Sequence, residues 1–231
     1  MSHKINGAKN VTQMIHGYTR TFGSMDPRQT SLVHTLPIME HFYTLQGEGF
    51  HVGKAAYFIR AGGCDVGCHW CDVKESWDAD KHPQTPIEDL VKLTSEHKGD
   101  IVVITGGEPA MYDLKEITQA LHKVGKQTHI ETSGVYELTG EFDWITFSPK
   151  KFKAPHASIY KGAHELKVVI NHPSDLEFAE EHAEKVNDSC LLYLQPEWSK
   201  RERMMPIIIE YTKNHPQWRI SLQTHKYLNI P

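Results

Sequence analysis

The stretch Gly62-Gly63-Cys64-Asp65-Val66-Gly67-Cys68-His69-Trp70-Cys71-Asp72 places three cysteines in a C-x3-C-x2-C spacing on one short loop. It follows the apolar run from Ala55 to Ile59, which is typical of a buried β-strand. Three thiolates on a tight loop can each bind a different iron of a 4Fe-4S cubane, and no fourth cysteine lies nearby. The pattern predicts a cluster with one open iron at the end of a strand.

Beyond this loop, short apolar runs alternate with segments that carry helix-start patterns. In four of these segments a capping residue precedes a Glu by three positions, beginning at Thr85, Asp113, Ser174 and Ser199. Strand followed by helix, repeated, predicts an α/β sheet with parallel strands. The expected strands are Ala55 to Ile59, Ile101 to Ile104, Thr128 to Ile130, Trp144 to Phe147, Leu166 to Ile170, Leu191 to Leu194 and Arg219 to Leu222.

Polar residues recur where these strands end. They include Thr105 to Glu108, Glu131 to Ser133, Ser148 with Lys150, and Gln195, while Lys167 lies within a strand. Any one of them could simply cap a helix or end a strand. The carboxyl ends of parallel strands share one edge, however, so their recurrence predicts a common binding site there.

The bulk composition restricts the classes of function. With 231 residues, 39% hydrophobic and 23% charged, the chain can form one substantial core, and we expect a domain over residues 39–231 after an N-terminal extension over 1–38. A net charge of −4 gives no basic field for nucleic acid. Without an apolar run of about eighteen residues or a signal peptide, we expect a cytoplasmic protein with a small-molecule substrate.

Two motifs resemble those of the radical SAM superfamily: the three-cysteine loop with Trp70 before its last cysteine, and the downstream Gly106-Gly107-Glu108-Pro109. This resemblance implies an α/β fold, an open and incomplete (β/α) barrel. It also implies a 4Fe-4S cluster on Cys64, Cys68 and Cys71, whose open iron chelates S-adenosyl-L-methionine (SAM). Cleavage of SAM would give a 5′-deoxyadenosyl radical.

Further motifs resemble the 7-carboxy-7-deazaguanine synthase family, from about Phe42 to the last residue. The clearest are Thr44 to Gly49, Ile130 to Gly134, Ser148 to Lys150 and Leu222 to Pro231. The resemblance implies a carbon-nitrogen lyase of queuosine biosynthesis, a tRNA modification pathway. The reaction would be ring contraction of 6-carboxy-5,6,7,8-tetrahydropterin to 7-carboxy-7-deazaguanine with release of ammonia, begun by hydrogen abstraction from C6.

The family resemblance also implies roles for particular residues, without assigning a catalytic side chain. Arg60 would pair with the substrate carboxylate, which suits a planar guanidinium. The implied substrate contacts are Leu45, Gln46, Gly47, Arg60, Thr105 and Pro231. The implied SAM contacts are Trp70, Gly106, Gly107, Glu108, Ser148, Pro149, Lys150, Gln195, Pro196, Glu197 and Trp198.

The implied partners and metal complete the expectation. The family implies a flavodoxin- or ferredoxin-type reductant and a homodimer. Many members bind Mg²⁺ through a Thr or Ser after the Cys-Asp pair, but Val73, which has no side-chain oxygen, occupies that position here. A magnesium ion would then need substrate, water and a backbone or Asp72 oxygen.

Two other interpretations account for the three-cysteine loop. A radical SAM activase would install a glycyl radical on a partner protein, although the motif from Leu45 to Gly47 argues against it. A zinc-stabilised binding module without catalysis would need a fourth ligand, for which His69 is the local candidate. Colour separates the zinc module, because an iron–sulfur protein is brown and a zinc protein is colourless.

Overall fold

The sheet begins earlier in the chain than the sequence indicates. The computed structural model describes residues 34–231, so most of the expected extension over 1–38 lies outside the described residues. Its last four positions belong to strand β1 (Thr35–Leu45). Pro37 makes this strand hard to predict from sequence, because proline has no N–H to donate to a neighbouring strand and is therefore rare inside sheets. It is tolerated here near the sheet edge, where its carbonyl accepts from the Gly62 N–H at 2.8 Å.

Nine strands form one open sheet in the order β3-β1-β2-β4-β5-β6-β7-β8-β9. From β2 onward the neighbouring pairs are parallel, whereas β1 pairs antiparallel with both β2 and β3. The seven strands expected from sequence are the seven parallel ones, and β1 and β3 are additional. The remaining strands are β2 (Ala55–Ala61), β3 (Gln84–Pro86), β4 (Ile101–Gly106), β5 (Gln127–Thr132), β6 (Trp144–Phe147), β7 (Glu165–Ile170), β8 (Leu191–Pro196) and β9 (Trp218–Ile220).

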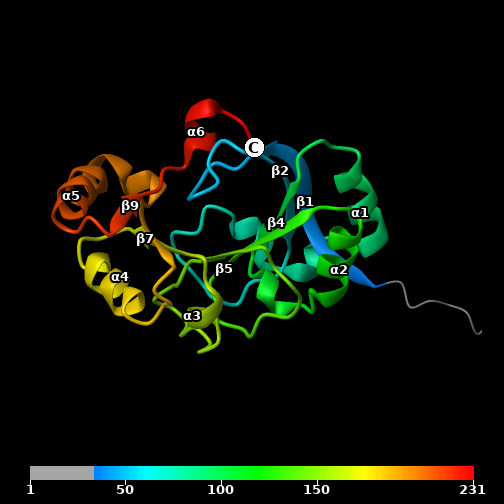
Figure 1. Ribbon diagram of the computed structural model, residues 1–231, viewed down its shortest axis with the longest axis horizontal. Helices are drawn as coiled ribbons and strands as arrows, with labels where there is room; N and C mark the ends of the chain where they lie inside the picture. Colours follow the sequence, from blue (N-terminus) through cyan, green and yellow to red (C-terminus); the bar gives the residue numbers. More distant parts are fainter. Residues whose placement is uncertain (1–33) are drawn as a thin grey trace, which may run out of the picture. The chain divides into compact units, whose positions relative to one another are not determined.

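Helices connect the parallel strands and cover the outside of the sheet. Figure 1 shows α1 and α2 over the half that contains β1, β2 and β4, and α4 and α5 over the half that contains β7 and β9. None of the helices in residues 34–231 is long and apolar enough to cross a bilayer. The helices are α1 (Ile87–Ser95), α2 (Lys115–Lys123), α3 (Ile159–Gly162), α4 (Asp175–Ala183), α5 (Arg201–Asn214) and α6 (Thr224–Leu228).

The four expected helix starts lead into α1, α2, α4 and α5, and at α2 the expected capping bond forms, because Asp113 Oδ1 accepts from the Lys115 N–H at 3.0 Å. The other three expected caps do not form. Thr85 pairs with β1 inside β3, and the N-cap of α1 is Pro86. Ser174 makes no capping bond to α4. Before α5, the Glu197 carboxylate instead accepts from the Ser199 and Lys200 N–H groups of a short 3-10 turn. The pattern of a capping residue three positions before a Glu therefore located all four helices but identified the cap of only one of them.

The alternation of side chains along each strand separates core from site. In β7, Leu166, Val168 and Ile170 are buried in a core cluster with residues of α3, α4 and α5. Lys167 and Val169, between them, face the opposite side of the sheet and line a pocket. A second cluster joins strands β1, β2, β4 and β5 to α1 and α2. The two edges, β3 and β9, stay unpaired with each other, so the barrel is incomplete as expected.

Candidate active site

A pocket of about 430 Å³ lies at the carboxyl ends of the parallel strands. Its lining includes every residue that the sequence predicts to bind the cluster, SAM or substrate, except Pro149. Pro149 lies between Ser148 and Lys150, which do line the pocket. The size suits small ligands, so the fold brings predicted residues from all along the chain into one site.

The 3-10 turn that follows the cysteine loop, Lys74–Trp77, holds the start of this loop through two backbone hydrogen bonds. The Gly63 N–H donates to the Ser76 carbonyl at 2.6 Å, and the Cys64 N–H donates to the Trp77 carbonyl at 3.1 Å. All three thiols are free and line the pocket. Three soft thiol ligands on one pocket wall form a donor set that fits a cluster with one open iron.

Burial sets the protonation of the thiols. It raises the pKa of Cys68 to about 11, and it also raises the pKa of Cys64. At neutral pH both thiols therefore carry protons until iron displaces them. In the described chain, no three His, Cys, Asp or Glu side chains are arranged to hold a single metal ion. His69 packs edge-on against Phe152 instead, with ring centroids 5.3 Å apart, so the zinc alternative lacks a placed fourth ligand.

The Gly106-Gly107 turn after β4 packs directly on the cysteine loop. The Gly107 N–H donates to the Ala61 carbonyl at 2.9 Å, and the Glu108 N–H donates to the Gly63 carbonyl at 2.8 Å. A Cβ at position 107 would lie 2.1 Å from the Gly63 carbonyl oxygen. Only glycine therefore allows this approach of two backbones, which brings the predicted SAM motif against the cysteine loop.

Glu108 organises the base of the site through its carboxylate. One oxygen accepts from the Ala110 N–H at 3.0 Å and from the Thr132 hydroxyl at 2.5 Å. The other accepts from the Ser133 N–H at 2.8 Å and from the Ser133 hydroxyl. This side chain is 1% exposed, and its four donors fix the turn after β4 to the end of β5.

Among the residues predicted to contact SAM, Lys150 and Gln195 have fixed positions. The Lys150 ammonium donates to the Ser148 carbonyl at 2.7 Å and to its hydroxyl at 2.6 Å, and burial lowers its pKa. The Gln195 side-chain oxygen accepts from the Ser221 hydroxyl at 2.7 Å. Trp198, at the rim, stacks with the Arg201 guanidinium at 4.3 Å from its ring centroid.

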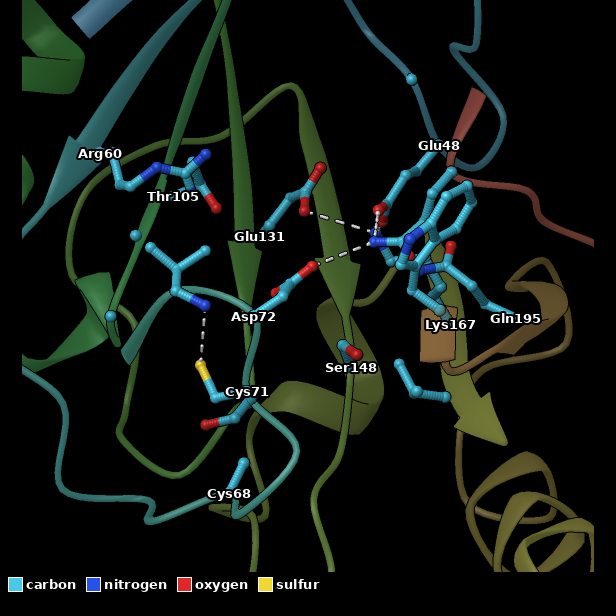
Figure 2. Close-up of a pocket in the computed structure, with 18 of the residues that line it drawn as sticks. Glu48, Arg60, Cys68, Cys71, Asp72, Thr105, Glu131, Ser148, Lys167 and Gln195 are labelled. Carbon is cyan, nitrogen blue, oxygen red and sulfur yellow. Dashed lines mark hydrogen bonds and ion pairs between the residues drawn. The ribbon is translucent and has the colours of Figure 1, made fainter. Parts of the chain in front are cut away.

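Arg60 and Thr105 lie side by side on the other wall, because β2 and β4 pair them in register. Figure 2 shows the Arg60 guanidinium next to Thr105. Its Nε donates to Glu40 Oε1 at 2.6 Å. This bond uses one of the five guanidinium N–H donors, and Arg60 still lines the pocket. The arrangement can bind a carboxylate at the end of the two strands.

A buried charge network crosses the floor of the pocket. Lys167 forms ion pairs with Glu48, from the loop after β1, and with Glu131 on β5 (3.3 Å), as Figure 2 shows. Gln46 donates its amide N–H to Glu131 Oε1 at 3.0 Å. Burial lowers the pKa of Lys167, but the carboxylates of Glu131, Glu48 and Glu165 together outweigh it and raise that pKa overall. The ammonium thus fixes the predicted substrate loop to strands β5 and β7.

The C-terminal segment returns to the pocket over this loop. Thr224 donates both its N–H and its hydroxyl to the Gly47 carbonyl, at 2.9 and 2.8 Å. His225 packs so closely on Gly47 that a Cβ there would lie 2.2 Å from His225 Nδ1. Asn229, with φ 54°, ends α6 in the left-handed conformation, and Pro231 lines the pocket. In Figure 1 the C-terminus lies between α6 and β2.

Several residues of this site had no predicted role. Glu48, Gln223, His225 and Lys226 all line the pocket and belong to stretches that resemble family motifs, and Asp72, expected only as a possible magnesium ligand, lines it as well. Their polar side chains carry no distinctive spacing, so only the resemblance could have indicated them. The apolar lining residues Phe42, Phe58 and Val169 lie in strands, where apolar residues are expected in any core, and Trp77 lies in the 3-10 turn after the cysteine loop; none was predicted to line the site.

Comparisons with known proteins agree with this geometry. A model of the radical SAM superfamily matches residues 58–171. A 7-carboxy-7-deazaguanine synthase from Flavobacterium psychrophilum is 59% identical over 85% of this chain and 93% of the relative. The chain belongs to the 7-carboxy-7-deazaguanine synthase family. A synthase from Synechocystis is 50% identical, over 90% of this chain and 99% of the relative.

A solved structure supports the same family assignment. The crystal structure of QueE from Escherichia coli matches with a TM-score of 0.76 and 34% identity, covering 83% of this chain and 95% of that one. The chain is therefore a radical SAM enzyme of the 7-carboxy-7-deazaguanine synthase family, and the superfamily implies a 4Fe-4S cluster and SAM. The activase and the zinc module are set aside.

Proposed function

We propose that this enzyme contracts the ring of 6-carboxy-5,6,7,8-tetrahydropterin to give 7-carboxy-7-deazaguanine and ammonia in queuosine biosynthesis. The names of its relatives support this reaction. The observation that carries it is the guanidinium of Arg60, which faces the same pocket as the three free thiols and still has N–H donors available. A carboxylate on the substrate is the natural partner of such a group.

We propose that Cys64, Cys68 and Cys71 bind the cluster. The cluster and SAM, when bound, supply the radical that starts the reaction. The residues of the chain position these groups. The Gly106-Gly107 backbone would let SAM approach the cysteine loop, and Lys150 and Gln195 would contact SAM. The other residues predicted to contact SAM, including Pro149, keep that role as part of this proposal.

Orientation of the substrate follows from the opposite wall and the floor. Arg60 and Thr105 hold the carboxylate end, while Gln46 and Glu131 present amide and carboxylate groups to the polar edge of a pterin. Leu45, Gly47 and Pro231 close the pocket above it. Holding the reacting carbon in one place is the main contribution that such residues can make to a radical reaction.

The proposal also includes the partners of the enzyme. A flavodoxin- or ferredoxin-type protein would supply the electron, and the enzyme would act as a homodimer. A reducing compartment such as the cytoplasm would keep the three free thiols ready for iron.

Anaerobic reconstitution with iron and sulfide, followed by reduction and incubation with SAM and 6-carboxytetrahydropterin, tests the reaction by mass spectrometry. We expect 7-carboxy-7-deazaguanine. Formation of 5′-deoxyadenosine without this product would retain the cluster chemistry and refute the substrate. Cys68→Ala should lose the brown cluster, while Cys190→Ala should keep it, because Cys190 lies in the core cluster behind β7.

A further inference from the structure

A cation from α6 pairs with Asp72, the residue that follows the last cysteine of the loop. Lys226, on α6, places its ammonium 2.7 Å from Asp72 Oδ2, and the Gln223 amide nitrogen lies 3.4 Å from the same oxygen. On its other side the ammonium lies 5.1 Å from the ring centroid of Trp198. The side chain of Lys226 is only 22% exposed. Both members of the ion pair line the pocket.

The same wall offers a magnesium ion no side-chain oxygen at position 73, and its carboxylate, Asp72, is already paired with a cation. Mg²⁺ binds oxygen in a near-octahedral shell, usually with one or two carboxylates among its ligands. Val73, at the position where the family resemblance implies a hydroxyl ligand, offers none. Asp72 Oδ2 already accepts from Lys226 and Gln223. Figure 2 shows the Asp72 carboxylate directed away from Cys71, toward the side of the floor network. These residues do not fit a magnesium site.

We propose that the Lys226 ammonium replaces a divalent cation in this enzyme, donating to a substrate oxygen other than those that Arg60 binds, so that substrate binding needs no Mg²⁺. An ammonium has three donors, of which Asp72 takes one. The ring of Trp198 faces the cation without accepting a full hydrogen bond, so a donor remains for a ligand in the pocket. This inference rests on the proposed function, because it concerns the carboxylated substrate.

Metal binding is tested directly, without turnover, in enzyme that holds an oxidised cluster, SAM and substrate but receives no reductant. Mn²⁺ takes the same oxygen ligands as Mg²⁺, and its EPR signal reports binding, since the oxidised cluster is silent. We expect no bound Mn²⁺ in the wild type or in Val73→Ala, and bound Mn²⁺ in the double variant Val73→Thr/Lys226→Met, which restores the hydroxyl and removes the competing ammonium. Stoichiometric binding of Mn²⁺ to the wild type would overturn the proposal.

The role of Lys226 is tested by calorimetric titration of substrate in the presence of EDTA. Lys226→Met keeps much of the side-chain volume and loses the charge, so we expect Kd to rise about tenfold or more, the usual cost of a lost charged hydrogen bond. Lys226→Arg should retain most of the affinity, and SAM binding and iron content should be unchanged in both variants. An unchanged Kd in Lys226→Met would refute the assignment.

Turnover separates this inference from the proposed function. Equal rates of product formation with EDTA and with added Mg²⁺ support both. A product that forms only with Mg²⁺ overturns the inference and leaves the function intact. Absence of product under both conditions overturns the function, and the inference with it.

Discussion

Replacement of Lys167 by methionine removes the one cation of the buried network on the pocket floor. The lysine side chain is 4% exposed, and its partners Glu48 and Glu131 are 14% and 22% exposed. Methionine fills a similar volume, so the main change is the loss of charge. Two carboxylates would then remain in a poorly solvated site without their counterion. Removing one partner of a buried ion pair destabilises a fold more than replacing both partners with apolar residues.

The expected loss of stability is about 3–5 kcal/mol, the range for removing one partner of a buried pair. For a domain of this size each kcal/mol lowers Tm by about 2–4 °C, so a fall of about 6–20 °C follows. Burial opposes ionisation of Glu48, but Lys167 holds its pKa below the usual value, and the pKa of Lys167 itself is raised. The wild-type pair therefore stabilises the fold from above about pH 4.5 to about pH 10.

Urea denaturation monitored by circular dichroism, at pH 5 and pH 7, measures this effect. In Lys167→Met the uncompensated carboxylates favour their protonated forms, so the deficit should shrink as the pH falls to 5. Lys213→Met is the matched control, because its i,i+3 pair with Glu210 is exposed and should contribute under about 1 kcal/mol. A loss at Lys167 no larger than that of the control would refute the reasoning.

Three further variants test other parts of the molecule. Arg60→Lys should raise KM for the substrate about tenfold, because an ammonium cannot grip a carboxylate bidentately; an unchanged KM would exclude the clamp. Gly107→Ala should show little of the visible iron–sulfur absorbance after reconstitution, because its Cβ would displace the cysteine loop. Burial raises the pKa of Glu165 to about 7, so ionisation of this carboxyl lowers the free energy of unfolding by roughly 3 kcal/mol as the pH rises from about 4.5 to 7. Glu165→Gln should remove this pH dependence, which denaturation at pH 5 and pH 8 measures.

Much of the fold was predictable because the relevant signals are local. Each of the seven parallel strands and four longer helices shows its own pattern of apolar residues, and the three cysteines lie within eight residues of one another. The order of strand and helix then placed the polar strand ends at one edge. Strand β1 was not predicted because Pro37 interrupts its pattern, and β3 was not predicted because three residues are too few to show a period.

The sequence alone determined the three cysteines of the loop, which we propose as cluster ligands, the glycines beside it and the absence of a hydroxyl at Val73. Only the tertiary structure decided which charges meet. Lys167 joins Glu48 and Glu131 because the sheet brings strands β5 and β7 and the loop after β1 together. Lys226 reaches Asp72 because α6 folds back over the cysteine loop. Such pairings depend on contacts between distant segments, and these form only when the whole sheet buries its apolar face.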